Sequence, residues 1–158
     1  MEGELREGID VVLNQLIFIS DALHGCGTTI WAASMYVPSP ESGSASPREI
    51  VVKDSWIDPL RKFTEGGILA KLNEAGVEGV PKLIHEQQVQ GPHPSIPNLK
   101  VNQSTHTIRT LLSQVNTQDY HICVLSCLLT EPLGQEIMNF SSLAKLLVAF
   151  IDYVSSVF

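Results

Sequence analysis

The chain has 158 residues, a length that suits one domain and is too short for two of ordinary size. Its hydrophobic fraction of 44% excludes a disordered chain, because enough apolar side chains are present to form a core. The net charge of −7 argues against nucleic acid and against an anionic membrane as partners, since both attract clustered lysine and arginine.

The first ten residues are rich in charge and lack the basic start and apolar stretch of a signal peptide, so no export signal is expected. Apolar residues nevertheless recur at helical spacing near this end of the chain. They are Leu5, Ile9, Val12, Leu13 and Leu16. This spacing predicts a short helix, forming an N-terminal helical extension over residues 1–15.

Two strands with a glycine turn between them follow this extension. The segments Leu16–Leu23 and Thr28–Val37 are rich in β-branched and aromatic residues, which favour strands. Gly25 and Gly27 lie between them and supply backbone freedom for a reversal. The pattern predicts strand, glycine turn, strand.

The next part of the chain contains a loop, a third strand and a helix. The run Pro38–Pro47 is mostly proline, serine and glycine, so a flexible loop is predicted. A strand over 49–53 follows it. A helix over about 58–75 is predicted from three apolar residues at helical spacing, despite two glycines inside it. These apolar residues are Ile68, Leu69 and Leu72.

The second half of the chain alternates between strands and turns. Further strands are predicted at Val80–Val89 and Tyr120–Leu125, and a turn-rich loop at 91–97 separates them. The segment His106–Leu112 fits a strand or a short helix equally well. The pattern therefore indicates a mixed fold with an antiparallel sheet.

The chain ends in a predicted amphipathic helix over 141–157. Its apolar stripe consists of Leu143, Leu146, Leu147, Phe150, Ile151 and Val154. The longest uninterrupted apolar run, Leu146–Ile151, is far shorter than the roughly 18 residues of a membrane span, so none is expected. Three cysteines without metal-type spacing predict reduced thiols and an intracellular protein, cytoplasmic or nuclear.

The order of four residues carries the chemical interpretation. The two glycines alone are explained equally well by a hairpin turn. However, an apolar strand then ends at Lys53, and Glu65 follows in the predicted helix. A triphosphate is strongly negative, so glycine N–H groups and an ammonium on a rigid strand suit it, and a carboxylate holds that ammonium in place. This order is typical of the nucleotide-binding half of a kinase.

Four stretches of the chain closely resemble the fungal-type protein kinase family. They are Ser20–Trp31, Val52–Trp56 with its Lys-Asp-Ser-Trp string, Thr64–Leu69 and Gly79–Ile84. The resemblance continues to the final helix and covers nearly the whole chain from Leu16. It implies an α+β fold, a kinase-like N-lobe over residues 16–130 with about five antiparallel strands and one packed helix. Residues 131–158 would then be the hinge exit and the first helix of a C-lobe.

The resemblance also implies the residues of an ATP site. Gly25 and Gly27 would form the phosphate loop, Lys53 would be the strand lysine and Glu65 its partner. The family tends to carry an acidic residue where Gly67 stands, so position 67 is the alternative origin of that partner. The hinge beside adenine would comprise about Leu125 to Leu129, with the contacts from Leu125, Ser126, Cys127 and Leu128.

The printed sequence contains no His-Arg-Asp and no Asp-Phe-Gly motif. These motifs supply the catalytic base and the metal ligands of a kinase, so Mg²⁺ is expected only with a C-lobe. The chain is therefore expected to be a truncated kinase that binds ATP weakly and is inactive alone. The alternative is a non-catalytic interaction module, which self-associates or binds a protein through the apolar stripe of its last helix.

Overall fold

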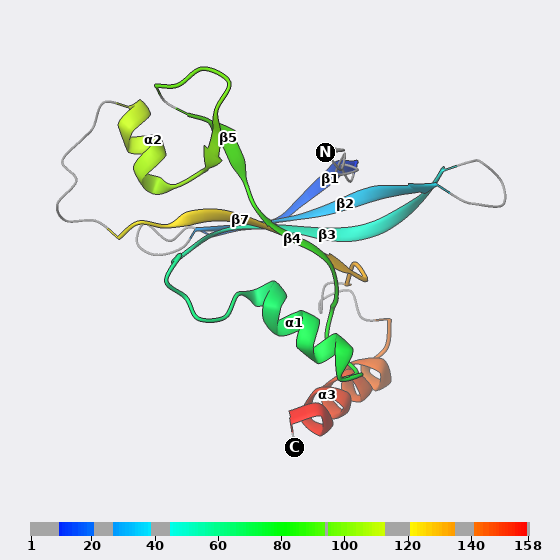
Figure 1. Ribbon diagram of the computed structural model, residues 1–158. Helices are drawn as coiled ribbons and strands as arrows, with labels where there is room; N and C mark the ends of the chain where they lie inside the picture. The colour runs from blue at the N-terminus through cyan, green and yellow to red at the C-terminus, as the bar shows by residue number, and fades with distance from the viewer. Residues whose placement is uncertain are drawn as a thin grey trace.

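A computed structural model describes residues 10–20, 27–38, 45–93, 95–112, 121–134 and 141–157, with only the backbone of residues 37, 38, 45 and 152–157. The described strands form a five-stranded antiparallel sheet and a small two-stranded sheet, and three helices accompany them (Figure 1). The predicted mixed architecture with a five-stranded antiparallel sheet is confirmed.

The five strands are ordered β1-β2-β3-β7-β4 across the large sheet. Each pairs antiparallel with its neighbours, so the early strands lie side by side as hairpins and β7 inserts between β3 and β4. Their bounds are β1 Val11–Ile19, β2 Thr28–Pro38, β3 Ala45–Ile57, β4 Lys82–Gln88 and β7 Val124–Glu131. Since β3 lies at the centre, it is hydrogen-bonded to a neighbouring strand along both of its edges.

The predicted helix over residues 1–15 is wrong for its second part, because β1 begins at Val11. Residues 1–9 lie outside the described residues. Nearly every position of β1 is apolar, so its residues fit the spacing of a helix and that of a strand alike. The apolar pattern therefore does not distinguish the two. Pairing with β2 decides in favour of the strand, although bulges interrupt the register near Asn14 and Ile17.

The core of the sheet lies on one face, across the β2–β3 hairpin and β7. Ala33 and Ile50 are completely buried there. Met35, Val52 and Leu129 complete this core cluster, and Trp31 packs against it. The hairpin is longer than predicted because Pro38 pairs with Ala45, so the strand after the loop begins before residue 49.

Helix α1, Glu65–Glu74, is shorter than the predicted helix over 58–75. The residues before it form turns instead, because Asp58 accepts hydrogen bonds from two backbone N–H groups, those of Leu60 and Arg61. Thr64 then caps the helix. Figure 1 shows α1 on one side of the large sheet, where it lies beside β4.

Between β4 and β7 the chain forms an excursion on the other side of the sheet from α1 (Figure 1). Strands β5, Gln90–Pro92, and β6, Lys100–Asn102, pair as a hairpin, and most of the predicted loop at 91–97 lies between them. The ambiguous segment is helix α2, Thr105–Leu111, capped by Ser104. A side-chain cap of this kind is worth about 1 kcal/mol and favours the helix over the strand.

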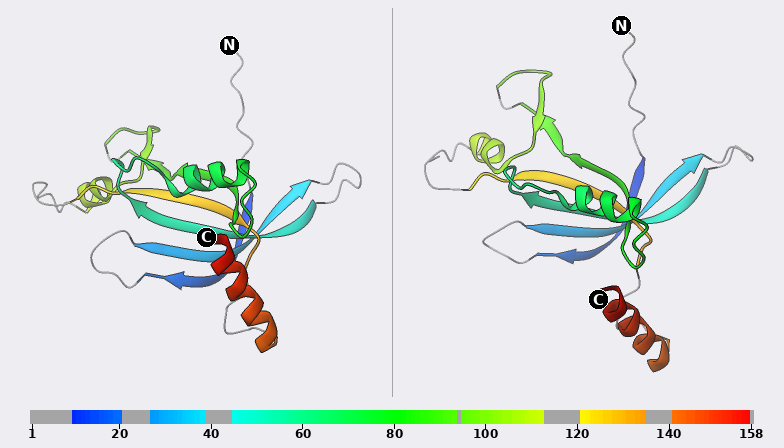
Figure 2. Two further views of the ribbon diagram at one scale, coloured as in Figure 1. Left: turned by 90° about the horizontal axis from the view of Figure 1, so that it is seen from below. Right: turned by 60° about the horizontal axis from the view of Figure 1, so that its bottom comes forward.

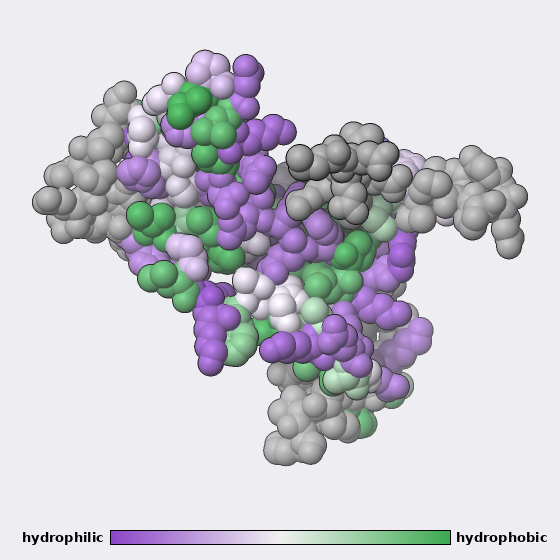
Figure 3. Space-filling model, viewed as in Figure 1, coloured by the Kyte–Doolittle hydropathy of each residue, from purple (hydrophilic) through white to green (hydrophobic). Residues whose placement is uncertain are grey.

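The predicted C-terminal helix is confirmed as α3, Leu143–Val157, which projects beyond the large sheet (Figure 2). In its apolar stripe Leu143, Leu147, Phe150 and Ile151 remain about half or more exposed, and Leu146 is partly buried. In the view of Figure 1, the surface shows apolar residues scattered among hydrophilic ones (Figure 3). Within the described ranges, no helix combines the length and the hydropathy needed to cross a bilayer.

Candidate functional site

The site begins with an ion pair between strand β3 and helix α1. Lys53 Nζ lies 2.6 Å from Glu65 Oε2, and both side chains are partly open to solvent. Register with Ile30 on one side and Leu128 on the other fixes the strand position of the lysine. The predicted pair of Lys53 with Glu65 is therefore confirmed, and the partner comes from position 65 rather than from position 67.

The helix N-terminus determines where Glu65 lies. Thr64 has extended backbone and its Oγ1 accepts a hydrogen bond of 3.0 Å from the Gly67 N–H. This cap makes Glu65 the first helical residue, where the helix dipole favours a carboxylate. The glutamate therefore leaves the helix at its end nearest to Lys53.

A second carboxylate, Glu86 on β4, holds this helix end against the sheet. Its Oε2 accepts a bond of 2.6 Å from the Thr64 hydroxyl, and its Oε1 accepts one of 3.2 Å from the Gly66 N–H. Gly66 is buried at this contact. A Cβ at position 66 would lie 2.5 Å from Glu86 Oε2, so only glycine permits this approach. The sequence analysis missed Glu86; two adjacent glycines at a helix start were its only signal.

The other end of α1 is also attached to β4. Asn73 donates from Nδ2 to the Pro81 carbonyl oxygen at 3.0 Å and accepts at Oδ1 from the Leu83 N–H at 2.8 Å. Hydrogen bonds thus attach both ends of α1 to β4 and to the residue before it. The orientation of Glu65 follows from this attachment.

A cavity of about 150 Å³ opens beside the ion pair. It is lined by Thr28, Lys53, Ser55, Trp56, Ile57, Arg61, Thr64, Glu65, Glu86 and Ser126. Hydroxyl and charged groups dominate this lining. Sites for drug-sized ligands usually measure about 300 Å³ or more, so the cavity suits one part of a nucleotide, such as a phosphate group, rather than the whole.

The predicted hinge residues lie inside strand β7, hydrogen-bonded to β3 on one side and to β4 on the other. The chain leaves the sheet only after Glu131. Ser126 shares the face of Lys53 and lines the cavity, as its pairing with Ser55 requires.

The remaining predicted site residues are only partly placed at the cavity. Leu128 pairs with Lys53 and shares its face, whereas Leu125 and Cys127 alternate to the opposite face. Gly25 lies outside the described residues. Gly27 is described, and its carbonyl oxygen accepts a hydrogen bond of 3.1 Å from the Trp56 N–H, which brings the end of the glycine segment beside β3.

Cys127 has an unusual environment on that opposite face. It packs against the core cluster and its thiol donates to the Asp54 carboxylate, its partner in the strand register. Burial first, and the hydrogen bond and negative charge of Asp54 next, raise the pKa of Cys127 from 9.0 to about 12. The thiol therefore stays protonated where ordinary thiols ionise.

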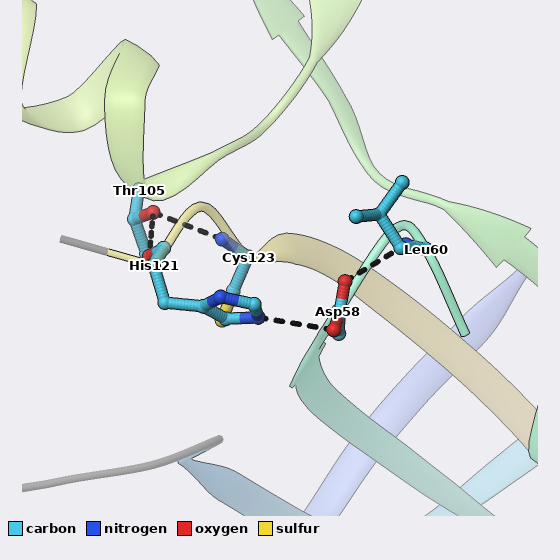
Figure 4. A network of polar contacts seen from close by, with 5 residues as sticks. All are labelled: Asp58, Leu60, Thr105, His121 and Cys123. Carbon is cyan, nitrogen blue, oxygen red and sulfur yellow. Dashed lines mark hydrogen bonds and ion pairs between the residues drawn. The ribbon is translucent and has the colours of Figure 1, made fainter.

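The loop that leads into α1 is fixed from the other side by a polar network (Figure 4). His121 Nε2 lies 3.1 Å from Asp58 Oδ2, just before β7 begins. Thr105 Oγ1 accepts at 3.1 Å from the Cys123 N–H, which links the same segment to α2. The His121 side chain is exposed. The network joins the turns before α1 to α2 and to the segment that enters β7.

We expect Gly66→Ala to destabilise the protein by about 1–3 kcal/mol, because the added methyl group meets Glu86 and must displace α1. Helix propensity alone predicts the opposite sign, a gain of about 1 kcal/mol. Urea unfolding measures the difference. Gly134→Ala, where an added Cβ meets nothing within 4 Å, is the control and should leave stability nearly unchanged. A Gly66→Ala variant more stable than the wild type would contradict the packing argument.

We expect Cys127 to react slowly with iodoacetamide at pH 9, on the order of 100-fold more slowly than free cysteine, since its thiolate is scarce below its raised pKa. Asp54→Asn removes a negative charge, lowers that pKa and should speed the reaction. Peptide mass spectrometry follows Cys127 separately, and Glu49→Gln on the same strand is the control. Equal rates for native and urea-unfolded protein would show that the environment has no effect.

Comparison with known proteins gives one match. The model of the fungal protein kinase family matches residues 2–157, nearly the whole chain. No curated protein and no solved structure matches it. The match spans the strand that carries Lys53, the helix that carries Glu65 and the final helix. The chain belongs to the fungal protein kinase family.

Proposed function

We propose that this chain is the nucleotide-binding lobe of a fungal-type protein kinase. Lys53 contacts the α and β phosphates of ATP, and Glu65 holds its ammonium in place. The segment of Gly25 and Gly27 covers the phosphates. The observation that carries the proposal is the Lys53–Glu65 ion pair of 2.6 Å, next to a cavity of phosphate size in a member of a kinase family.

The cavity lining supports a phosphate better than a base. Thr28, Ser55 and Ser126 contribute hydroxyl groups that can donate to phosphate oxygens. Adenine needs an apolar slot, and in the proposal Leu128 and the chain after Glu131 contribute to it. In this proposal the phosphates therefore lie against the face of the sheet that carries these hydroxyl groups.

Metal binding and catalysis are assigned to a second lobe in this proposal. The two carboxylates at the cavity are engaged, Glu65 by Lys53 and Glu86 by Thr64 and the Gly66 N–H. Neither is free to bind Mg²⁺. The printed 158 residues also lack the His-Arg-Asp and Asp-Phe-Gly motifs, so we propose that they do not transfer phosphate by themselves.

We further propose an intracellular location, cytoplasmic or nuclear. Cys127, in the described strand β7, is a free thiol. Free thiols are usual where glutathione keeps proteins reduced.

We expect the purified 158-residue chain to bind ATP with a dissociation constant of roughly hundreds of micromolar or weaker, because it forms only part of an enclosed site. Lys53→Met should abolish that binding, since it removes the ammonium and leaves Glu65 unpaired. NMR titration measures both variants. With Mg-ATP and a generic protein substrate, phosphate transfer should equal that of a control without enzyme.

Lys71→Met is the matched control, because Lys71 lies on α1 over the Phe63 ring and outside the cavity lining. It should bind ATP as the wild type does. Tight binding that survives Lys53→Met would place the nucleotide elsewhere. Turnover that disappears in Lys53→Met would contradict the proposed inactivity of the 158 residues.

A second function, a non-catalytic interaction module, is favoured by α3. Its stripe residues Leu143, Leu147 and Ile151 are 65%, 54% and 62% exposed, so the helix does not fold back onto the sheet. Burial of each such side chain is worth roughly 1.5–3 kcal/mol, which favours self-association or a protein partner. A lobe can serve both functions.

We expect the wild type to form oligomers that Leu147→Glu combined with Ile151→Glu dissociates into folded monomers. The charges oppose burial of the stripe without disturbing a helix that is already exposed. Light scattering measures the mass, and circular dichroism reports the fold. Lys145→Glu is the control on a different face of α3. A monomeric wild type whose double variant unfolds would assign the stripe to the core.

A further inference from the structure

Two cations line the phosphate-sized cavity, and only one of them has a role so far. Lys53 is paired with Glu65 at 2.6 Å. Arg61 lies in the turns that precede α1, and its guanidinium forms no ion pair with any residue that the structure describes. An arginine at the edge of a polar cavity, without a carboxylate of its own, is available for an anion.

The loop geometry explains why Arg61 stays at the cavity. Its N–H donates to the Asp58 carbonyl oxygen at 3.1 Å, and the Asp58 side chain is bound by Leu60 and by His121. Three residues further on, Thr64 is fixed by Glu86. The backbone is thus held on both sides of Arg61, which limits the places its long side chain can reach.

Among the charged groups that line the cavity, Arg61 is the one positive charge that no carboxylate in the lining offsets by an ion pair. The Lys53 and Glu65 charges offset each other, and the Glu86 carboxylate is a negative charge satisfied by neutral donors. A phosphate chain placed beside Lys53 therefore meets two carboxylates and needs a second cation. One guanidinium group can bind two phosphate oxygens at once, and each of these hydrogen bonds is roughly twice as strong as one between neutral groups.

We propose that Arg61 is a second phosphate-binding residue, which contacts the phosphate chain of the nucleotide together with Lys53. The inference rests on the proposed function for the identity of the ligand as a nucleotide. The phosphate contact itself requires only the cavity, its hydroxyl groups and the two cations. Arg61 thereby makes affinity depend on the number of phosphates.

The test compares ATP, inorganic tripolyphosphate and adenosine as ligands of the 158-residue chain in NMR titrations. In Arg61→Gln, affinity for ATP and tripolyphosphate should fall about fivefold, whereas adenosine binding should not change. Arg61→Lys should recover part of the loss, because it restores the charge without the planar fork. The loss should shrink in 0.5 M salt, where charges are screened.

Lys62→Gln is the matched control, since it removes the same charge from the adjacent residue, whose ammonium lies over the Phe63 ring instead of in the cavity. It should bind all three ligands as the wild type does. Equal losses in Lys62→Gln and Arg61→Gln would overturn the proposal, because net charge alone would explain them. Unchanged ATP and tripolyphosphate binding in Arg61→Gln would overturn it as well.

The ligands also separate this proposal from the proposed function. ATP binding that needs Lys53 but not Arg61 would overturn the role of Arg61 and leave the nucleotide site standing. Tripolyphosphate binding that needs Arg61, with no added affinity for ATP and none for adenosine, would support the phosphate contact and contradict the nucleotide function. No binding of ATP or tripolyphosphate by the wild type would overturn both.

Discussion

The arrangement of the helix on the sheet depends on one carboxylate, that of Glu86, which accepts two hydrogen bonds from the N-terminal end of α1. Unpaired N–H groups at a helix start need acceptors, and a carboxylate close to them is favoured by the helix dipole. Glu86 supplies this acceptor from the neighbouring strand. Glu86 binds both Thr64 and the Gly66 N–H, and Glu65 lies between these two residues. The backbone of Glu65 is therefore fixed, and its side chain reaches Lys53.

The sheet fixes the position of the second partner of the ion pair, Lys53. Lys53 is held by pairing on both sides of β3, so its Cα cannot move without the strands β2 and β7. A rigid strand and a fixed helix end bring two flexible side chains within 2.6 Å, which a solvent-exposed ion pair alone would not achieve. The energy of the pair is small, and its geometry comes from the elements around it.

Sequence reasoning found Lys53 and Glu65 because their chemistry follows chain order: an apolar strand that carries a lysine, and then a glutamate where a helix begins. It missed Glu86 because a strand register, absent from any local pattern, brings that residue to the helix. The family resemblance, rather than a local pattern, suggested the hinge at residues that the structure assigns to β7. Likewise, the first part of β1 was expected to be helical because its mostly apolar residues fit a helical spacing as well as a strand.

The attachment of α1 at both ends has a consequence for motion. Glu86 holds its first turn and Asn73 its last, both through β4. Separating Glu65 from Lys53 by rotating the helix would therefore break hydrogen bonds at both ends, or carry β4 along and strain its pairing with β7. A change that separated Glu65 from Lys53 would therefore have to act on the sheet edge as well as on the helix.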